Sequence, residues 1–243
     1  MERRYVRAVE LSGELPCDSY LWDVPAVRYL RKAGRLEFSH DVTFLVGENG
    51  TGKSTLLEAI AVACGFNAEG GSRNFSFSTK DTHSALHHAL TVVRSAYPKD
   101  GFFLRAESLY NAASYLDSLD DMRLTARNYG GSLHTKSHGE SFLALVQNRF
   151  GGQGLYFLDE PEAALSPMRM LTLLAELDRL VKMNSQFIIA THSPILMAFP
   201  GAEILQITEE GIRPAAYRET EHYIVTRRFL EKPEQMLKYL LED

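Results

Sequence analysis

Short apolar runs of strand length recur along the chain, and segments with helical spacing of apolar positions separate them. The runs occur in YVRAVEL (5–11), RLEFSHDVTFLV (35–46), GFFLRAE (101–107), GLYFLDE (154–160), SQFIIATHS (185–193) and AEILQIT (202–208). Such alternation favours a mostly parallel sheet that is covered by helices. The pattern therefore predicts an α/β fold, with a region of β-structure at the N-terminus.

Four segments have the pattern of helices. Residues 24–34 have a proline in the expected first turn and end with Gly34, which predicts a short helix. Residues 54–65 are apolar nearly all round, so a buried helix that ends at Gly65 is expected. The other two predicted helices lie at 82–97 and 141–150, and residues 108–136 resemble a small helical lobe.

Length and composition are those of one globular unit. A chain of 243 residues fits a single domain, 1–243, that includes the small lobe. The formal net charge of −5 argues against a chain coated in nucleic acid but not against a local basic patch. Cys17 and Cys64 have no disulfide or metal spacing, and Cys64 is expected to be a buried thiol. The N-terminus lacks the apolar core of a signal peptide, and His192 interrupts the longest apolar run, so a cytoplasmic protein without membrane insertion is expected.

The sequence GENGTGKS follows a predicted strand and opens a predicted helix, which is the context that a phosphate-binding loop requires. Its glycines allow backbone N–H groups to converge on phosphate oxygens at a helix N-terminus. Lys53 is expected to reach the β- and γ-phosphates, Ser54 to bind Mg²⁺, and Thr55 to donate to the α-phosphate. The predicted nucleotide-binding loop consists of Gly47, Glu48, Asn49, Gly50, Thr51, Gly52, Lys53 and Ser54.

Two further strands end in polar residues. Asp159 and Glu160 follow a buried strand, where unpaired charges are costly, so Asp159 is expected in the Mg²⁺ shell and Glu160 as the general base. The alternative for Glu160 is a cap of the next turn. His192 ends another strand and is expected to face the ligand crevice and sense the γ-phosphate, although a structural role is its alternative. Ser193 precedes a proline and is expected to cap a helix.

The polar stretch HTKSHGESF (134–142) lies between the P-loop and the acidic strand, at the start of the helix at 141–150. A metal site, a catalytic serine and a solvated turn are all conceivable. A nucleophilic serine needs a base beside it, and nothing in the sequence indicates one. A serine and a glycine at a helix N-terminus instead suit anion binding. One chain cannot readily place two helix ends around one phosphate in this topology, whereas a second copy can.

These motifs together resemble an ABC-type ATPase domain, nearer to the RecF and SMC group of DNA-repair ATPases and to OLD-type ATPases than to transporters. GENGTGKS is similar to Walker A and LYFLDE to Walker B. SHGE (137–140) is similar to the signature loop, EAALS to the D-loop and THS to the switch histidine; the motifs span about residues 40–200. The resemblance implies that Ser137 and Gly139 contact a γ-phosphate bound by another subunit, so that ATP joins two chains head to tail.

The chain departs from the family pattern at three places. Glu107 stands where the family has the Q-loop glutamine, and an acid there could still reach the metal or the attacking water. Ser166, followed by a proline, replaces the D-loop aspartate of transporters and is typical of a helix N-cap. No clear aromatic residue for the adenine is evident, and Tyr29 is a weak candidate. The long coiled coil of SMC proteins is absent from the sequence pattern.

Two lesser patterns concern metal and DNA. His83 and His87 are spaced to bind a metal from one helix face, but no third ligand is evident and an exposed polar face is favoured. A basic stripe is predicted on the short helix; it is either a nucleic-acid footprint or, as the favoured interpretation, a solvated basic face. The stripe consists of Arg28, Arg31, Lys32 and Arg35.

The sequence therefore predicts an ABC-like ATPase that binds and hydrolyses Mg-ATP as a homodimer. By analogy with the family alone, the expected partner is DNA or a protein in repair or phage defence. One alternative is the ATP-hydrolysing subunit of a transporter whose membrane part is another chain; the missing glutamine and D-loop aspartate argue against it. A second alternative is an ATP-gated binding module without catalysis, against which Glu160 argues.

Overall fold

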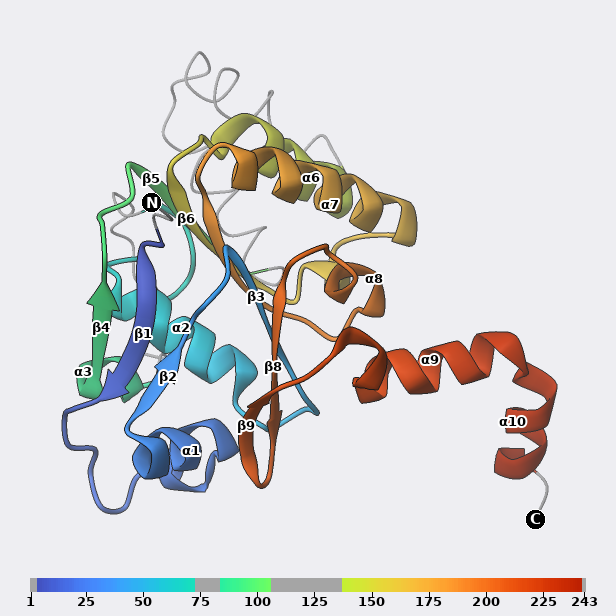
Figure 1. The fold of residues 1–243 in the computed structure, drawn as a ribbon, viewed down its shortest axis with the longest axis horizontal. Coiled ribbons are helices and arrows are strands. Elements are labelled where there is room, and N and C mark those ends of the chain that lie inside the picture. The colour runs from blue at the N-terminus through green and yellow to red at the C-terminus, as the bar shows by residue number, and fades with distance from the viewer. Residues whose placement is uncertain (1–3, 73–83, 106–136, 242–243) are drawn as a thin grey trace.

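The computed structural model describes residues 4–72, 84–105 and 137–241. It contains two sheets with helices on both sides (Figure 1). The strands are β1 (Val6–Leu11), β2 (Arg35–Glu37), β3 (Val42–Val46), β4 (Leu90–Arg94), β5 (Asp100–Arg105), β6 (Gly154–Asp159), β7 (Gln186–Ala190), β8 (Glu203–Thr208) and β9 (Gly211–Pro214). The helical lobe predicted for 108–136 lies outside the described residues.

The helices connect these strands in the expected alternating order. The α-helices are α1 (Pro25–Ala33), α2 (Lys53–Ala63), α3 (Leu86–Ala89), α6 (His138–Arg149), α7 (Pro167–Lys182), α8 (Pro194–Met197), α9 (Glu221–Glu231) and α10 (Pro233–Leu241). Short 3₁₀ turns are η1 (Tyr20–Asp23), η3 (Pro161–Ala163) and η4 (Tyr217–Glu219). Gly34 ends α1 in a left-handed conformation with φ of 73°, as its sequence pattern predicts.

The larger sheet has the strand order β5-β6-β7-β3-β8-β9. Neighbouring strands from β5 to β8 are parallel, and β9 pairs with β8 antiparallel. Consequently the C-terminal ends of β3, β6 and β7 meet at one edge of the sheet, where ligands bind in folds of this kind. The α/β prediction with a mostly parallel sheet is confirmed.

The predicted N-terminal β region is also present, as a three-stranded antiparallel sheet of order β2-β1-β4. The helix predicted for residues 82–97 is wrong in its second half, because only Leu86–Ala89 is helical in the described part. The segment from Leu90 to Arg94 is instead a strand that pairs with β1. The β-branched residues Thr91, Val92 and Val93 favour a pleated surface, and β1 offers an edge for pairing.

Alternate residues of the parallel strands enter two separate cores. On one face Leu45, Phe157 and Ile188 pack with α1, α2 and the antiparallel sheet. On the other face Phe44 and Tyr156 pack with α6, α7 and α8. Figure 1 shows these helices on opposite sides of the strands. The buried Cys64 belongs to the first core, as the sequence predicts.

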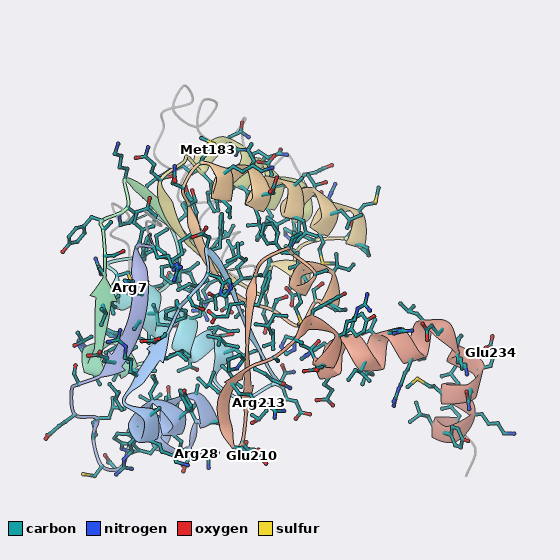
Figure 2. The ribbon with its side chains drawn as sticks, in the orientation of Figure 1. Arg7, Arg28, Met183, Glu210, Arg213 and Glu234 are labelled. Carbon is teal, nitrogen blue, oxygen red and sulfur yellow. The ribbon has the colours of Figure 1, made fainter. Side chains whose placement is uncertain are left out.

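The chain ends in a C-terminal arm, which we define as α9 and α10 (residues 221–241). The arm projects away from the two sheets (Figure 1), and neither helix contains a buried residue. Glu234 marks this projecting part in Figure 2. In the described portion of the chain, no helix combines the length and apolar character that crossing a membrane requires.

Candidate functional site

The P-loop connects the end of β3 with the start of α2, and its backbone has the shape that a phosphate cradle needs. Gly47 has φ of 151° and Gly52 has φ of 92°. A Cβ atom at position 47 would lie 2.3 Å from the Ile207 carbonyl oxygen, so only glycine fits there. Lys53 is buried at the first position of α2, and its Nζ donates to the Glu48 carbonyl oxygen at 2.8 Å. Burial lowers the Lys53 pKa, and nearby carboxylates oppose that effect.

The loop is braced by its own residues and by α1. Thr51 Oγ1 donates to the Glu48 carbonyl oxygen at 2.8 Å. The Ala26 N–H donates to the Thr51 carbonyl oxygen at 3.2 Å, which joins the start of α1 to the loop. Glu48 and Asn49 are exposed and line a cleft beside His192, whereas Thr55 lies half-buried in the first turn of α2.

Ser54 and Asp159 meet although they lie on different elements. Ser54 Oγ donates to Asp159 Oδ1 at 2.8 Å, which places the start of α2 against the end of β6. Burial raises the pKa of Asp159, while the hydrogen bond from Ser54 and the charge of Arg105 act in the opposite direction. The two oxygen-bearing side chains are of the kind that bind Mg²⁺.

An ion-pair network behind Asp159 was not anticipated from the sequence. Arg105, at the end of β5, donates from its NH1 nitrogen to Glu58 Oε2 at 2.7 Å. Its Nε lies 3.4 Å from Asp159 Oδ2. Glu58 is a buried residue of α2 and also accepts from the Ser84 N–H. An arginine in the GFFLRAE run and a glutamate inside an apolar helix are the signals that could have indicated this pairing.

Glu160 and His192 lie at the ends of the neighbouring strands β6 and β7. Glu160 has φ of 48°, a left-handed conformation that is uncommon outside glycine. Its Oε1 lies 3.5 Å from His192 Nε2, and the Glu160 side chain is 42% exposed. His192 Nε2 is buried and makes no hydrogen bond to any described residue. Burial lowers the pKa of His192, and the charge of Lys53 lowers it further.

Glu162 organises the tip of β7 and was also missed. It accepts from Thr191 Oγ1 at 2.8 Å and from the His192 backbone N–H at 2.5 Å. Its side chain therefore fixes the backbone that carries His192. Burial raises the pKa of Glu162, and these hydrogen bonds partly oppose that effect. The acidic residue two positions after Glu160 was the available signal.

The SHGE segment forms the start of α6. Ser137 is the N-cap: its hydroxyl accepts from the Glu140 N–H, and the Glu140 carboxylate accepts from the Ser137 N–H at 2.9 Å. This reciprocal pair is a capping box, which the spacing of serine and glutamate in SHGE could have indicated. Arg169 of α7 donates to Ser137 Oγ at 3.0 Å. A Cβ on Gly139 would lie 2.6 Å from the Arg169 NH1 nitrogen, so close packing also explains this glycine.

Several lesser predictions have different outcomes. Ser166 and Ser193 occupy the N-cap positions of α7 and α8, but neither hydroxyl makes a capping hydrogen bond. The predicted position of Ser193 as the N-cap of α8 is confirmed, although its Oγ donates to Met170 Sδ at 3.2 Å instead of capping the helix. Tyr29 lies on α1, and its ring packs against Gly211 at the start of β9. Glu107 and His83 lie outside the described residues.

Among the four cations of the basic stripe, two form ion pairs and a third stacks on an aromatic ring. Arg28 forms an ion pair with Glu209, and Arg31 stacks its guanidinium 4.6 Å from the centre of the Trp22 ring. Arg28 lies with Glu210 at the edge where α1 meets the β8–β9 turn (Figure 2). Arg35 is on β2 rather than on α1, and it pairs with Glu10 and Glu37. The grouping of all four cations on one helix is thus wrong, and the interpretation as a solvated face fits better.

Two family models match the chain. Residues 26–100 match an AAA domain, and residues 140–198 match an AAA domain whose description names the AbiEii toxin of type IV TA systems as a candidate member. The first match contains the P-loop, and the second contains Glu160 and His192. With the fold described above, these matches make the chain similar to P-loop ATPase domains of the AAA/ABC type.

The individual proteins to which the chain is similar include three from bacteria. The chain is 27% identical over 191 residues to an "Uncharacterized ABC transporter ATP-binding protein" of Haemophilus influenzae, covering 70% of this chain and 71% of that protein. Its fold is similar to cbiO1 of Clostridium perfringens, part of the ABC transporter complex cbiONQ, with a TM-score of 0.50, 16% identity and coverage of 98% and 99%. The SMC head domain of Thermotoga maritima is 16% identical, with a TM-score of 0.46 and coverage of 88% and 100%.

Proposed function

We propose that this chain hydrolyses ATP with Mg²⁺ and that two copies close head to tail around the nucleotide. The observation that carries the proposal is the meeting of three sequence-distant groups beside the P-loop lysine. Ser54 touches Asp159 at 2.8 Å, and Glu160 lies 3.5 Å from His192 on the adjacent strand. The charges of Glu160 and Asp159 both oppose the lowering of the Lys53 pKa by burial, which supports a shared site for these three residues.

In this proposal the loop residues bind and orient the triphosphate. The backbone N–H groups of the loop and the N-terminus of α2 attract phosphate oxygens. Lys53 exchanges its contact with the Glu48 carbonyl for the β- and γ-phosphates. Ser54 and Asp159 would hold Mg²⁺, and the ion would supply charge neutralisation for the phosphates. Glu107 stays a proposed outer ligand.

Glu160 acts as the general base. Its carboxylate is partly exposed, so water can reach it, and its left-handed backbone turns it away from the strand. The water oxygen forms a bond to the γ-phosphorus, the bond from that phosphorus to the ADP oxygen breaks, and the water proton passes to Glu160. His192 Nε2 makes no hydrogen bond to a described residue, and when it carries the ring proton it can donate to a γ-phosphate oxygen. Glu162 holds His192 in place from behind.

Closure by a second copy would supply the signature segment. Ser137 and Gly139 begin α6, a helix of more than three turns whose N-terminus favours anions. Within one chain the partners of Ser137 among the described residues are Glu140 and Arg169, not the P-loop. A γ-phosphate held by the P-loop of one copy can therefore meet Ser137 and Gly139 only from the other copy in this proposal.

The coupled partner can be DNA or a membrane protein. The names of the Haemophilus and Clostridium relatives favour a transporter subunit, whereas the RecF-like motif pattern favours a DNA-linked process. Neutralisation of Arg28 and Arg35 weakens the case for DNA binding at that surface. Duplex DNA should stimulate hydrolysis with a steep loss of binding at higher salt if DNA is the partner. Absence of DNA binding at low salt, with copurification of a membrane protein, would assign the transporter role.

Phosphate release tests the proposal directly. Purified protein should release phosphate from ATP only with Mg²⁺, and EDTA should abolish turnover. Lys53→Ala should abolish both ATP binding and hydrolysis, because it removes the cation that contacts the phosphates. Arg228→Gln, in the exposed part of α9, is the control and should behave as wild type. ATP binding without any Mg²⁺-dependent release would contradict the enzyme and support an ATP-gated binding module.

A further inference from the structure

The first turn of α9 is fixed beside the nucleotide site although the rest of the arm projects outward. Thr220, the N-cap of α9, is fully buried, and its Oγ1 donates to the Tyr217 carbonyl oxygen at 2.8 Å. The same hydroxyl accepts from the Tyr223 N–H. A buried and hydrogen-bonded cap restricts the direction of the helix start. His222, one residue before Tyr223, is held in this first turn.

His222 contacts His192, the residue proposed to interact with the γ-phosphate. Its Nε2 lies 3.0 Å from His192 Nδ1, and the two ring centres are 5.1 Å apart. Both imidazoles line one cleft together with Glu48 and Asn49 of the P-loop. Burial lowers the pKa of His192 and of His222, and the charge of Lys53 lowers both further. A pair of neutral rings is therefore expected near neutral pH.

A hydrogen bond between two neutral imidazoles fixes where the remaining proton lies. If His222 Nε2–H donates, His192 Nδ1 is the acceptor and the single proton of His192 lies on Nε2. That nitrogen is buried and unpaired among described residues, and it lies 3.5 Å from Glu160, on the side of the reacting groups. If His192 Nδ1–H donates instead, its Nε2 carries no proton and cannot donate to a phosphate oxygen.

We propose that His222 is a positioning residue, which holds the His192 ring and fixes its proton on Nε2, so that neutral His192 can donate to the γ-phosphate. This inference rests on the proposed function, because His192 acts on the γ-phosphate only if the chain binds ATP for hydrolysis. It also makes the start of the C-terminal arm part of the catalytic apparatus, through contact with His192 rather than with the substrate. His222→Gln retains an N–H donor near the position of Nε2, whereas His222→Phe keeps a ring and removes the donor.

The first test is independent of turnover. Nitrogen-15 NMR of histidine-labelled full-length protein reports the tautomer of each imidazole, and His192→Gln assigns the His192 signals. We expect the proton of His192 on Nε2 in wild type and in His222→Gln, and a mixture of tautomers in His222→Phe. Arg228→Gln is the matched control on the same helix and should leave the tautomer unchanged. A wild-type His192 protonated on Nδ1 would overturn the inference, whether or not the protein hydrolyses ATP.

The second test separates positioning from folding. Loss of one hydrogen bond is worth about 1 kcal/mol, so His222→Phe should lower kcat about five- to tenfold while the Kd for ATP stays within about twofold. His222→Gln should restore most of the rate, and His222→Phe should have no further effect in a His192→Ala background. Unchanged kcat in His222→Phe, or equal loss in both variants, would refute the positioning role. If wild type has no ATPase activity, the proposed function fails and the tautomer measurement alone decides this inference.

Discussion

The carboxylate of Glu160 and the imidazole of His192 face each other across the ends of adjacent strands, with Oε1 and Nε2 3.5 Å apart. This distance is too long for a good hydrogen bond, so the carboxylate and the imidazole can each form a hydrogen bond with a third group. Glu160→Gln keeps the size of the side chain and removes the proton acceptor. Turnover should fall about 10²-fold or more, while ATP binding persists. Phosphate release and equilibrium ATP binding measure the two effects, and Glu210→Gln is an exposed control.

The backbone of the P-loop should tolerate a methyl group at one glycine and reject it at another. Gly50 has φ of 83° with nothing within 4 Å of a Cβ, so Gly50→Ala adds only backbone strain, about 1–2 kcal/mol. Gly47→Ala adds a collision with the Ile207 carbonyl at 2.3 Å and should cost more. Urea unfolding of the two variants measures the difference. Equal losses of stability in the two variants would show that the backbone can move the Ile207 carbonyl away from the new methyl group without a loss of free energy.

Removal of the Glu162 carboxylate should loosen the segment after β7 that carries His192. Glu162→Ala leaves the Thr191 hydroxyl and the His192 N–H without their acceptor, so the free energy of unfolding should fall by about 1–3 kcal/mol. Glu162→Gln keeps one acceptor oxygen and should lose less. Turnover of the alanine variant should fall without loss of ATP binding. Wild-type stability in Glu162→Ala would indicate that the two groups find other partners.

Acid should destabilise the fold through Asp100. Burial favours the protonated acid, but hydrogen bonds from Tyr156, Gly151 and Arg149 outweigh it and lower the pKa of Asp100 below 3.8. A lowered folded pKa contributes stability above the unfolded pKa, and this contribution is lost as the pH falls through the folded value. Asp100→Asn should therefore be less stable than wild type at pH 7, and the gap should narrow toward pH 2. Urea unfolding across that range measures both curves.

If SHGE is the signature loop, a substitution in it should affect the ATP site of the other chain in the dimer. Ser137→Arg places a second cation beside Arg169 and at the expected γ-phosphate contact, so ATP-driven dimerisation should fail while monomer binding of ATP persists. Mixing this variant with Lys53→Ala creates one intact composite site per heterodimer, and ATP-dependent heterodimers should appear in sedimentation. Glu140→Gln weakens the same helix cap and is the control. Normal ATP-driven dimers of Ser137→Arg would leave SHGE with its capping role alone.

The alternating pattern predicted the α/β class because it depends on short-range periodicity, which the strands and their covering helices share. The same periodicity failed at 90–94, since a strand that pairs with β1 is selected by a distant edge rather than by local spacing. The P-loop and the strand-end acids could be found from spacing. Arg105, Glu58 and Glu162 were visible as charged residues in or beside apolar segments, but their partners could not be predicted, because the pairing depends on which strand ends lie side by side. His222 follows all the recognised motifs in sequence, and only the path of the chain after β9 brings it to His192.

The C-terminal arm has a consequence for how a partner could sense the nucleotide. Its helices bury none of their own residues, yet its first turn touches His192. The first turn of the arm is fixed against the rest of the protein. A ligand that binds farther along the arm can therefore move it with little disturbance of the two hydrophobic cores. Linkage is reciprocal, so any molecule that binds the arm more tightly in one nucleotide state alters nucleotide affinity by the same factor. Communication between partner and ATP therefore requires no deformation of the sheet.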